Sequence, residues 1–325
     1  MTDRNSVDGK QDIQDDSWHK EVVNRLVFAA VTEQRRARRW NIFFKCLLGL
    51  YLVALLILYL PQDWSDLPKP GEKHTAMVEL SGVISDTTEA SADTVIGGLR
   101  DAFDDENTKG VILRANSPGG SPVQSSYISR EIKRLRELHP DIKLYAVVTD
   151  VCASGCYYVI SAADEIYVDD ASIVGSIGVR MDSFGFVDTM KILGVERRLY
   201  TAGENKGFLD PFTPSKQSDV EHVNILLSEI HEQFKQAVED GRGERIKNSP
   251  QLFSGLVWTG QESVTMGLAD HTGSAGYVAR EVIGAEDIVD FTQKPDLLKR
   301  ITDRIGVAMA RATAELLLSG QGQVR

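Results

Sequence analysis

An uninterrupted apolar run near the amino end constrains this chain more than any other feature. Between Trp40 and Leu60 almost every side chain is apolar, and Lys45 is the one charged residue. A helix rises about 1.5 Å per residue, so a helix over this range is roughly 30 Å long, the thickness of a bilayer's hydrocarbon core. We therefore expect residues 40–60 to form a single transmembrane helix.

The charges that flank the run predict its orientation. A cluster of arginines precedes it, whereas Asp63 and Asp66 follow it. Positive charge collects on the cytoplasmic side of a span, so we expect residues 1–39 to be cytoplasmic and the chain after Leu60 to be exported across the inner or plasma membrane. The alternatives are a buried core helix, a cleavable signal peptide and a nucleic-acid-binding arginine patch. Pro61 follows the run with no small-residue cleavage site, which argues against a signal peptide.

The overall charge and the cysteine count argue against several functional classes. A net charge of −11 repels phosphate and disfavours a nucleic-acid partner. Three cysteines are too few for a disulfide scaffold, and their spacing matches no zinc pattern. No nucleotide motif is present either, so we expect the protein to need no metal and no cofactor.

Beyond the apolar run the sequence divides into a linker, one domain and a tail. Residues 61–73 contain three prolines and a glycine, which is typical of a stiff linker. Alternating strand and helix patterns then predict one α/β domain over residues 74–290. The tail, residues 291–325, is predicted to contain a helix that either packs on its own domain, forms an oligomer contact or lies on a surface. We expect strands over 76–84, 110–114, 143–149 and 165–168, and helices over 93–103, 121–138 and 217–239.

Ser154 is the first candidate catalytic residue. It follows the strand predicted over 143–149 and lies between Ala153 and Gly155, where a helix is expected to begin. Small neighbours let a substrate carbonyl approach, and the Gly155 amide is placed to donate to an oxyanion. The simple alternative is a serine that only caps the helix.

A serine hydroxyl needs a base, and the sequence favours a lysine over a histidine in this role. None of the six histidines lies in a glycine-rich or strand-end setting that would position a general base. Lys206 lies between Gly203 and Gly207 in a predicted loop, and a lysine kept neutral by burial can accept a serine proton. The alternative is an ordinary solvated surface lysine.

Two further turns carry small residues that suit an active site. Asn116-Ser117-Pro118-Gly119-Gly120-Ser121 connects a strand to a helix and could leave amide groups free for an oxyanion. Ser176, in the turn Gly175-Ser176-Ile177-Gly178, could hold a neutral lysine amine by a hydrogen bond. An ordinary turn and a packing role are the respective alternatives.

Taken together and in this order, the motifs resemble the signal peptide peptidase A family in its short, single-domain form. The family pattern has an N-S-P-G-G turn, then A-S-G-G-Y-Y, then G-S-I-G, then a G-x-x-K loop. The resemblance extends from about Thr75 to Val278 and includes Val257-Trp258-Thr259-Gly260 and Gly267-Leu268-Ala269-Asp270. It implies a fold of the Clp-protease and crotonase type, built from repeated β-β-α units.

The resemblance also implies a role for each candidate residue. Ser154 is expected to be the nucleophile and Lys206 the general base, with Ser176 orienting the lysine. Gly155 and Gly119 are expected to supply the oxyanion-hole amides, with Gly119 preferred to Gly120. In short-form relatives the lysine and the serine meet across a subunit boundary, so we expect a ring-like homo-oligomer.

The implied function is a membrane-anchored serine endopeptidase that degrades remnant signal peptides, which are short and apolar. A related protease acting on membrane proteins or other exported peptides is one alternative. A catalytically silent scaffold that binds apolar peptides is another.

The sequence departs from the family pattern at Cys156, where a second glycine is usual. Cys152 and Cys156 bracket Ser154 by two residues on each side. We expect two small, buried free thiols, because cysteines four apart on one helix rarely reach disulfide geometry. A disulfide in an oxidising compartment and a cysteine nucleophile are the alternatives.

Overall fold

The computed structural model describes residues 25, 28, 32–54, 71–247, 249 and 251–293. The chain divides into two units, Met1–Leu67 and Pro68–Arg325, and each is described here by itself. The first ten residues of the predicted linker, 61–70, and the predicted C-terminal helix lie outside the described residues.

The described part of the first unit is a helix over residues 32–54, whose side chains are exposed. It covers most of the predicted transmembrane span, but residues 55–60 of that span lie outside the described part of the chain. Among the described residues, no helix combines the length and the apolar character needed to cross a membrane.

The second unit is organised around one eight-stranded sheet, in the order β6-β5-β3-β2-β1-β8, with β4 beside β3 and β7 beside β4. All neighbouring strands are parallel except β5 and β6. The strands are β1 His74–Ser81, β2 Thr108–Ser117, β3 Lys143–Ala153, β4 Glu165–Val168, β5 Ile173–Gly175, β6 Val257–Thr259, β7 His271–Thr272 and β8 Ile288–Asp290.

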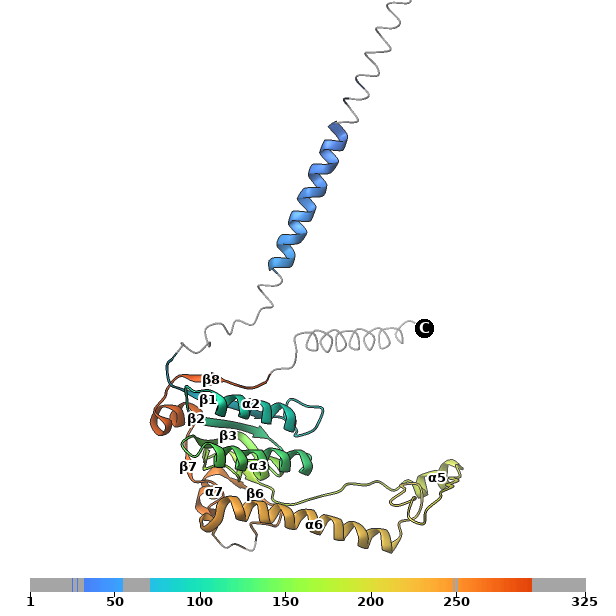
Figure 1. Ribbon diagram of the computed structural model, residues 1–325. Helices are drawn as coiled ribbons and strands as arrows, with labels where there is room; N and C mark the ends of the chain where they lie inside the picture. The colour runs from blue at the N-terminus through green and yellow to red at the C-terminus, as the bar shows by residue number, and fades with distance from the viewer. Residues whose placement is uncertain are drawn as a thin grey trace, which may run out of the picture. The chain divides into compact units, whose positions relative to one another are not determined.

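Helices connect the strands and cover the sheet, and Figure 1 shows α2 and α3 side by side over β1, β2 and β3. Both helices begin at a serine whose hydroxyl accepts a backbone N–H, Ser91 for α2 and Ser121 for α3. The helical segments are α2 Ala92–Asp104, α3 Pro122–Leu138, α4 Gly155–Ile160, α5 Val187–Leu193, α6 Gln217–Arg242, η2 Gly243–Arg245, α7 Gly260–Met266, α8 Ala275–Tyr277 and η3 Val278–Ile283.

The central strands are buried on both faces, as a parallel sheet requires. In β2, Val111 and Leu113 belong to the main core beneath α2 and α3, whereas Ile112 belongs to a smaller core with Val278 and Ile283 of η3. This explains why the strand reads as a continuous apolar run rather than an alternating one. The mixed α/β architecture and the seven predicted strands and helices are confirmed, although several extend further than expected.

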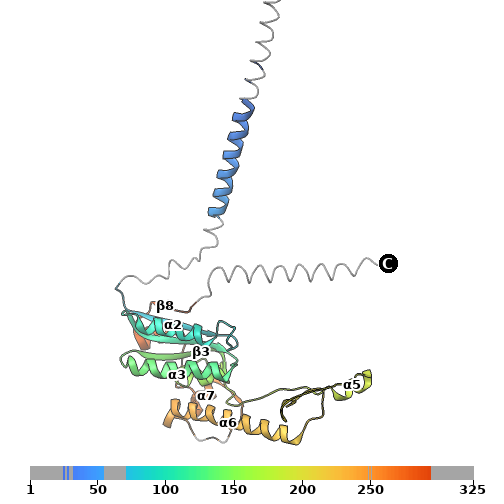
Figure 2. The ribbon, with the colours of Figure 1, turned by 45° about the vertical axis from the view of Figure 1, so that its right-hand side comes forward.

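Helix α6 is unusual because only part of its apolar stripe is covered. The stripe consists of Val220, Val223, Leu227, Ile230 and Phe234. Phe234 is buried in the main core, whereas Val220, near the N-terminus of the helix, is exposed. In Figures 1 and 2 this end of α6 extends beyond the sheet and meets the segment that contains α5. The fold therefore has a well-packed body and an apolar arm, which we define as residues 179–226.

Candidate active site

The ends of three neighbouring parallel strands meet at one edge of the sheet and line a groove of about 1030 Å³. The turn after β2 contributes Pro118 and two glycines, the end of β3 contributes Ser154, and the end of β5 contributes Ser176. Carboxyl ends of parallel strands are the usual location of ligand sites in such sheets. Four of the predicted site residues line this groove: Ser154, Ser176, Gly119 and Gly155.

Ser154 has a strained backbone conformation of the kind that is often found at active sites. Its φ of 54° and ψ of −122° lie in a region that L-residues rarely adopt, at a cost of about 1–3 kcal/mol. Its amide donates to the Gly175 carbonyl at 2.8 Å, and its carbonyl accepts from the Tyr158 amide at 3.0 Å. Its hydroxyl makes no capping hydrogen bond to α4, so the helix-cap explanation of Ser154 does not hold.

Ser176 lies beside Ser154 because the two strands are in register. Ala153 of β3 pairs with Gly175 of β5, so the next residue along each chain is a serine. Ser176 also has a positive φ, 53°, and its amide donates to the Leu256 carbonyl at 2.7 Å. Both half-buried serines therefore hold strained backbones at the same point of the groove.

Glycine is required where the turn after β2 approaches Ser154. A Cβ on Gly119 would lie 2.6 Å from the Gly155 nitrogen and 2.9 Å from the Ser154 Cβ. The Gly119 amide donates to the buried Ser117 hydroxyl at 3.1 Å. Among the described residues, no acceptor is found for the Gly155 and Gly120 amides. A Cβ on Gly155 would lie 3.2 Å from the Gly120 nitrogen, so these two unsatisfied amides lie close together.

The two cysteines around Ser154 form a disulfide, and their Cα atoms are 5.2 Å apart. Our expectation of two free thiols is wrong because it assumed that both residues lie on one helix. Cys152 is instead the penultimate residue of β3, and the chain reverses at Ser154 before Cys156 enters α4. Both cysteines are completely buried, as expected.

Lys206 is not among the residues that line the groove of its own protomer. It is exposed and lies in a loop that packs on the first turns of α6. Within this loop the Leu209 amide donates to Asp219 at 3.4 Å, and the Phe208 ring contacts His222 at 5.5 Å. From residue 222 to the groove residue Phe234, α6 rises about 18 Å, which exceeds the length of a lysine side chain.

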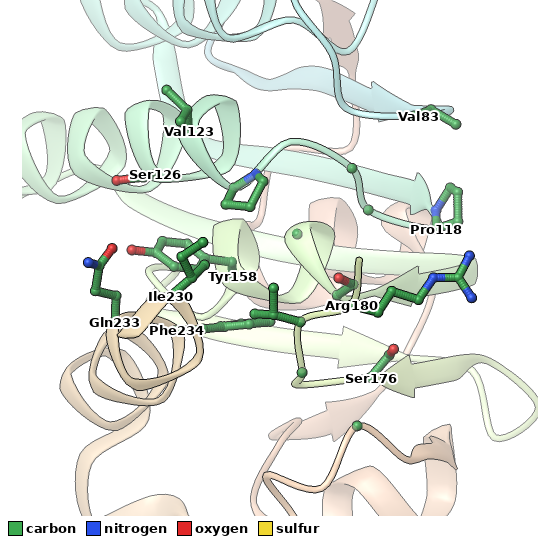
Figure 3. A pocket seen from close by; sticks show the side chains of 18 of the residues that line it. Val83, Pro118, Val123, Ser126, Tyr158, Ser176, Arg180, Ile230, Gln233 and Phe234 are labelled. Carbon is green, nitrogen blue, oxygen red and sulfur yellow. The ribbon is translucent and has the colours of Figure 1, made fainter. Parts of the chain in front are cut away.

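Several groove residues were missed by the sequence analysis because they come from distant segments. Figure 3 shows Ile230, Gln233 and Phe234 of α6 near Tyr158, across the groove from Ser176 and Arg180. Ile230 and Phe234 have the apolar spacing of a helix within the predicted range 217–239, but spacing cannot show what they face.

His231 is a second oversight, since all six histidines were dismissed as remote from a catalytic setting. Its Nε2 lies 3.2 Å from the carbonyl oxygen of Ile177, the residue after Ser176. The imidazole therefore holds the Ser176 turn against α6, while one ring nitrogen is already engaged.

The charge of the groove is opposite to that of the whole chain. Arg130 and Arg180 are the charged residues among those that line it. The Arg130 guanidinium stacks 5.2 Å from the Tyr127 ring centroid, and Arg180 lies 3.5 Å from Asp182. The other residues that line the groove are uncharged, and apolar side chains alternate there with four serines and Gln233.

A buried ion pair lies close to α4, the helix that follows Ser154. Arg242 of α6 donates to both carboxylate oxygens of Asp270, at 2.8 and 2.9 Å, and to the Gly267 carbonyl. Burial raises the pKa of Asp270, but the hydrogen bonds and charge of Arg242 more than offset this, so the pKa is lowered overall. Tyr157 of α4, three residues after Ser154, donates to the neighbouring Leu268 carbonyl at 2.8 Å.

Comparisons with known proteins find one matching family model and several similar chains. Residues 136–287 match the model of Peptidase family S49. A Na(+)/H(+) antiporter NhaA of Brucella abortus is 46% identical over 188 residues, which cover 58% of this chain and 25% of that protein. A protein of Methanocaldococcus jannaschii named as a protease is 33% identical over 54% of this chain and 56% of its own length.

A protein of Enterococcus faecium named as a signal peptide peptidase SppA is 27% identical over 72% of this chain and 66% of its own. The chain thus spans a quarter to about two thirds of the relatives described here.

Proposed function

We propose that this chain, a member of peptidase family S49, the family of signal peptide peptidase A, is a serine endopeptidase with a Ser154–Lys206 dyad. The observation that carries the proposal is the Ser154 hydroxyl, which serves no helix cap and stands on a strained backbone beside two unsatisfied amides. Strained residues of this kind cluster at active sites because the surrounding structure must hold them there.

In the proposed reaction, the Ser154 hydroxyl attacks the carbonyl carbon of a peptide bond while the Lys206 amine accepts its proton. The carbonyl oxygen becomes an oxyanion that accepts hydrogen bonds from the Gly155 amide and a second amide of the turn after β2. The protonated amine of Lys206 then gives this proton to the leaving nitrogen, and water hydrolyses the acyl-enzyme. Gly119 is the family's expectation for the second amide, whereas the engagement of Gly119 with Ser117 favours Gly120.

The lysine comes from a neighbouring copy of the chain in this proposal. The loop of Lys206 is held on α6 away from its own groove, and the arm that carries it exposes a continuous series of apolar side chains. Ile192 is 85% exposed and Tyr200 is 87% exposed, which is unusual for a monomer. A ring of copies covers this surface, carries each Lys206 to an adjacent Ser154 and Ser176, and removes it from water. Burial favours the neutral amine that a general base requires.

The proposed substrates are short apolar peptides, remnant signal peptides above all. Val83, Val123, Tyr158 and Phe234 give the groove its apolar lining. An anchor over residues 40–60 would hold the domain beside the bilayer, where such peptides collect. The Cys152–Cys156 disulfide supports an exported location, since disulfides persist in oxidising compartments and are rare in the cytosol.

The decisive experiment combines two inactive variants of the full-length protein in detergent. Ser154→Ala and Lys206→Ala are each expected to abolish hydrolysis of a fluorogenic signal-peptide substrate. When the two are coexpressed, random assembly gives about one quarter of the interfaces both intact residues, so about a quarter of wild-type activity is restored. No restoration at all, with rings of normal size, would contradict the shared dyad.

His231→Gln serves as the matched control for the identity of the base. Its bond to the Ile177 carbonyl can be replaced by a glutamine amide, so the variant is expected to keep most of the activity. Loss of activity in His231→Gln together with survival in Lys206→Ala would transfer the role of base to the histidine.

The same assays address the two alternatives. Cleavage of membrane-protein fragments in preference to signal peptides would identify a protease of broader membrane function. Failure of a fluorophosphonate to label Ser154 in the assembled ring would instead indicate a silent peptide-binding scaffold.

A further inference from the structure

We propose that the Cys152–Cys156 disulfide is a positioning device for the nucleophile, which holds the Ser154 backbone in its reactive conformation. The inference rests on the proposed function, because it assumes that Ser154 reacts. It goes beyond that function by assigning a catalytic contribution to two residues that never touch the substrate.

The cross-link closes a very small ring with Ser154 at its centre. The ring runs from Cys152 through Ala153, Ser154 and Gly155 to Cys156. The disulfide therefore joins the end of β3 to the first turn of α4, on either side of the strained residue Ser154. A cross-link between two such close positions restricts the backbone between them more than it stabilises the fold as a whole, since entropy gained from loop closure grows with loop length.

Each end of the ring is fixed to a different part of the site. Cys152 pairs with Ser117 of β2 on one side and with Val174 of β5 on the other. Ser117 is the residue whose hydroxyl holds the Gly119 amide. Cys156 lies in the first turn of α4, directly after the Gly155 amide. The disulfide thus couples the nucleophile, the oxyanion amides and the turn after β2 in one rigid unit.

The strained φ of Ser154 explains why such a unit is useful. Without restraint, a serine at φ of 54° relaxes toward ordinary backbone conformations, which moves its Oγ away from the groove and from the adjacent amides. A displacement of about 1 Å at a reacting atom costs on the order of 100-fold in rate. The second glycine of the family pattern is replaced here by a cysteine, so the covalent bond contributes a restraint that glycine cannot supply.

Complete burial of both cysteines indicates a permanent restraint and not a rapid switch. Reduction requires a thiolate or phosphine to reach one sulfur, and both residues are inaccessible in the folded domain. We therefore expect the disulfide to resist millimolar glutathione in the folded protein.

The first test counts thiols in the full-length protein isolated from its native membrane. Iodoacetamide in denaturant without reductant is expected to alkylate Cys46, the free cysteine of the described residues, and to alkylate Cys152 and Cys156 only after reduction. Mass spectrometry reads out the number of modified residues. Alkylation of Cys152 and Cys156 without reduction would overturn the proposal.

The second test compares Cys152→Ala/Cys156→Ala with a control of similar thermal stability. The double variant is expected to lose about tenfold or more in kcat with KM nearly unchanged, and to react with a fluorophosphonate correspondingly more slowly. The control is Leu99→Val on α2, far along the sheet, which lowers the melting temperature by core packing alone and keeps kcat. Unchanged kcat in the double variant would overturn the positioning role.

A third measurement covers a double variant that fails to fold. Because the folded domain shields both sulfurs, wild-type protein is incubated with a water-soluble phosphine in enough urea to open the domain transiently, and the urea is then removed. The phosphine reduces the disulfide to two thiols and is itself oxidised to the phosphine oxide, whose oxygen comes from water. Activity is expected to fall in proportion to the fraction of alkylatable Cys152 and Cys156. Full activity of reduced protein would contradict the proposal, whereas oxidised wild type without Ser154-dependent hydrolysis would refute the proposed function and leave the thiol count as an independent result.

Discussion

The end of β3 and the apolar arm belong to one protomer, but they differ in how many contacts within that protomer fix their conformation. At Ser154, two strands, one helix, a glycine turn and a disulfide fix a single strained residue. Around Lys206, the loop has one helix to pack on, and the apolar residues nearby face solvent. In the proposed dyad, therefore, the nucleophile is prepared within a single chain, whereas its base is prepared only by assembly.

Disrupting the arm is expected to give the largest effect. Ile192→Lys/Tyr200→Lys places charges in the proposed subunit contact, so the protein should become monomeric and lose activity by at least about 1,000-fold, as expected when a catalytic base is removed. Activity and light scattering are measured on the same samples.

The control for the arm variant is Leu138→Lys/Tyr277→Lys, which adds the same charges at exposed apolar residues outside the arm. It should keep both ring and activity. A fully active monomer of the arm variant would remove the contrast between the two regions.

Gly155→Ala tests how tightly the β3 end is determined. The added Cβ would lie 2.5 Å from the Ser125 hydroxyl oxygen and 3.2 Å from the Gly120 nitrogen, so the two amides must separate. Loss of one oxyanion donor costs about 100- to 1,000-fold in kcat, and we expect a fall in that range with an intact ring. Gly276→Ala is the matched control, because nothing lies within 4 Å of its Cβ position. Near-normal kcat in Gly155→Ala would show that its amide is not used.

Arg242→Met tests how strongly the C-terminal end of α6 is held against the rest of the domain. The substitution removes the buried partner of the Asp270 carboxylate and leaves it with the more exposed Arg245, 3.5 Å away. Breaking a buried pair costs about 3–5 kcal/mol of unfolding free energy, and we expect a loss toward the lower end of that range because Arg245 remains. Urea titration of the α/β domain within the full-length protein gives the value. The double variant Arg242→Met/Asp270→Asn should recover part of the loss, and equal losses in both would indicate that packing rather than charge is responsible.

The smallest predicted effect is a pH dependence at the α2–α3 contact. Hydrogen bonds from Arg134 and Arg100 lower the pKa of Glu131 from 4.5 to about 2. Because the pKa is depressed in the folded state, the stabilisation is complete above pH 4.5 and is lost as the pH falls toward 2. Both arginines are about half exposed, so solvent screening limits the contribution to about 1 kcal/mol. Chemical unfolding between pH 6 and 2.5 should show this loss in wild type and not in Glu131→Gln.

Local pattern was sufficient for most of the fold. The apolar run of β2 and the capped, periodic helices α2 and α3 are signals that reside in a few adjacent residues, and each was located correctly. The placement of Ser154 beside Ser176 is different, because it depends on the parallel register of β3 with β5. Periodicity cannot supply a register, so this pairing was expected only from the family resemblance.

The remaining differences between prediction and structure concern residues whose bonding or burial depends on the secondary structure around them or on a distant segment. Cys152 and Cys156 were treated as helical neighbours, and the strand-to-helix reversal at Ser154 made that assumption wrong. The apolar residues of α6 recur at helical spacing, but this spacing does not reveal whether Val220 is covered by its own chain or by another. The assignment of Lys206 as base stays a prediction for the same reason.

The positive φ angles of Ser154 and Ser176 have an evolutionary consequence. Glycine adopts such angles without a steric penalty, so replacing either serine by glycine relieves strain and is expected to make the folded chain more stable. At these two positions selection for stability and selection for catalysis act in opposite directions. Under the proposed function, a lineage that no longer needs the reaction would lose it by a substitution that improves folding, and its inactive proteins should be more stable than their ancestor.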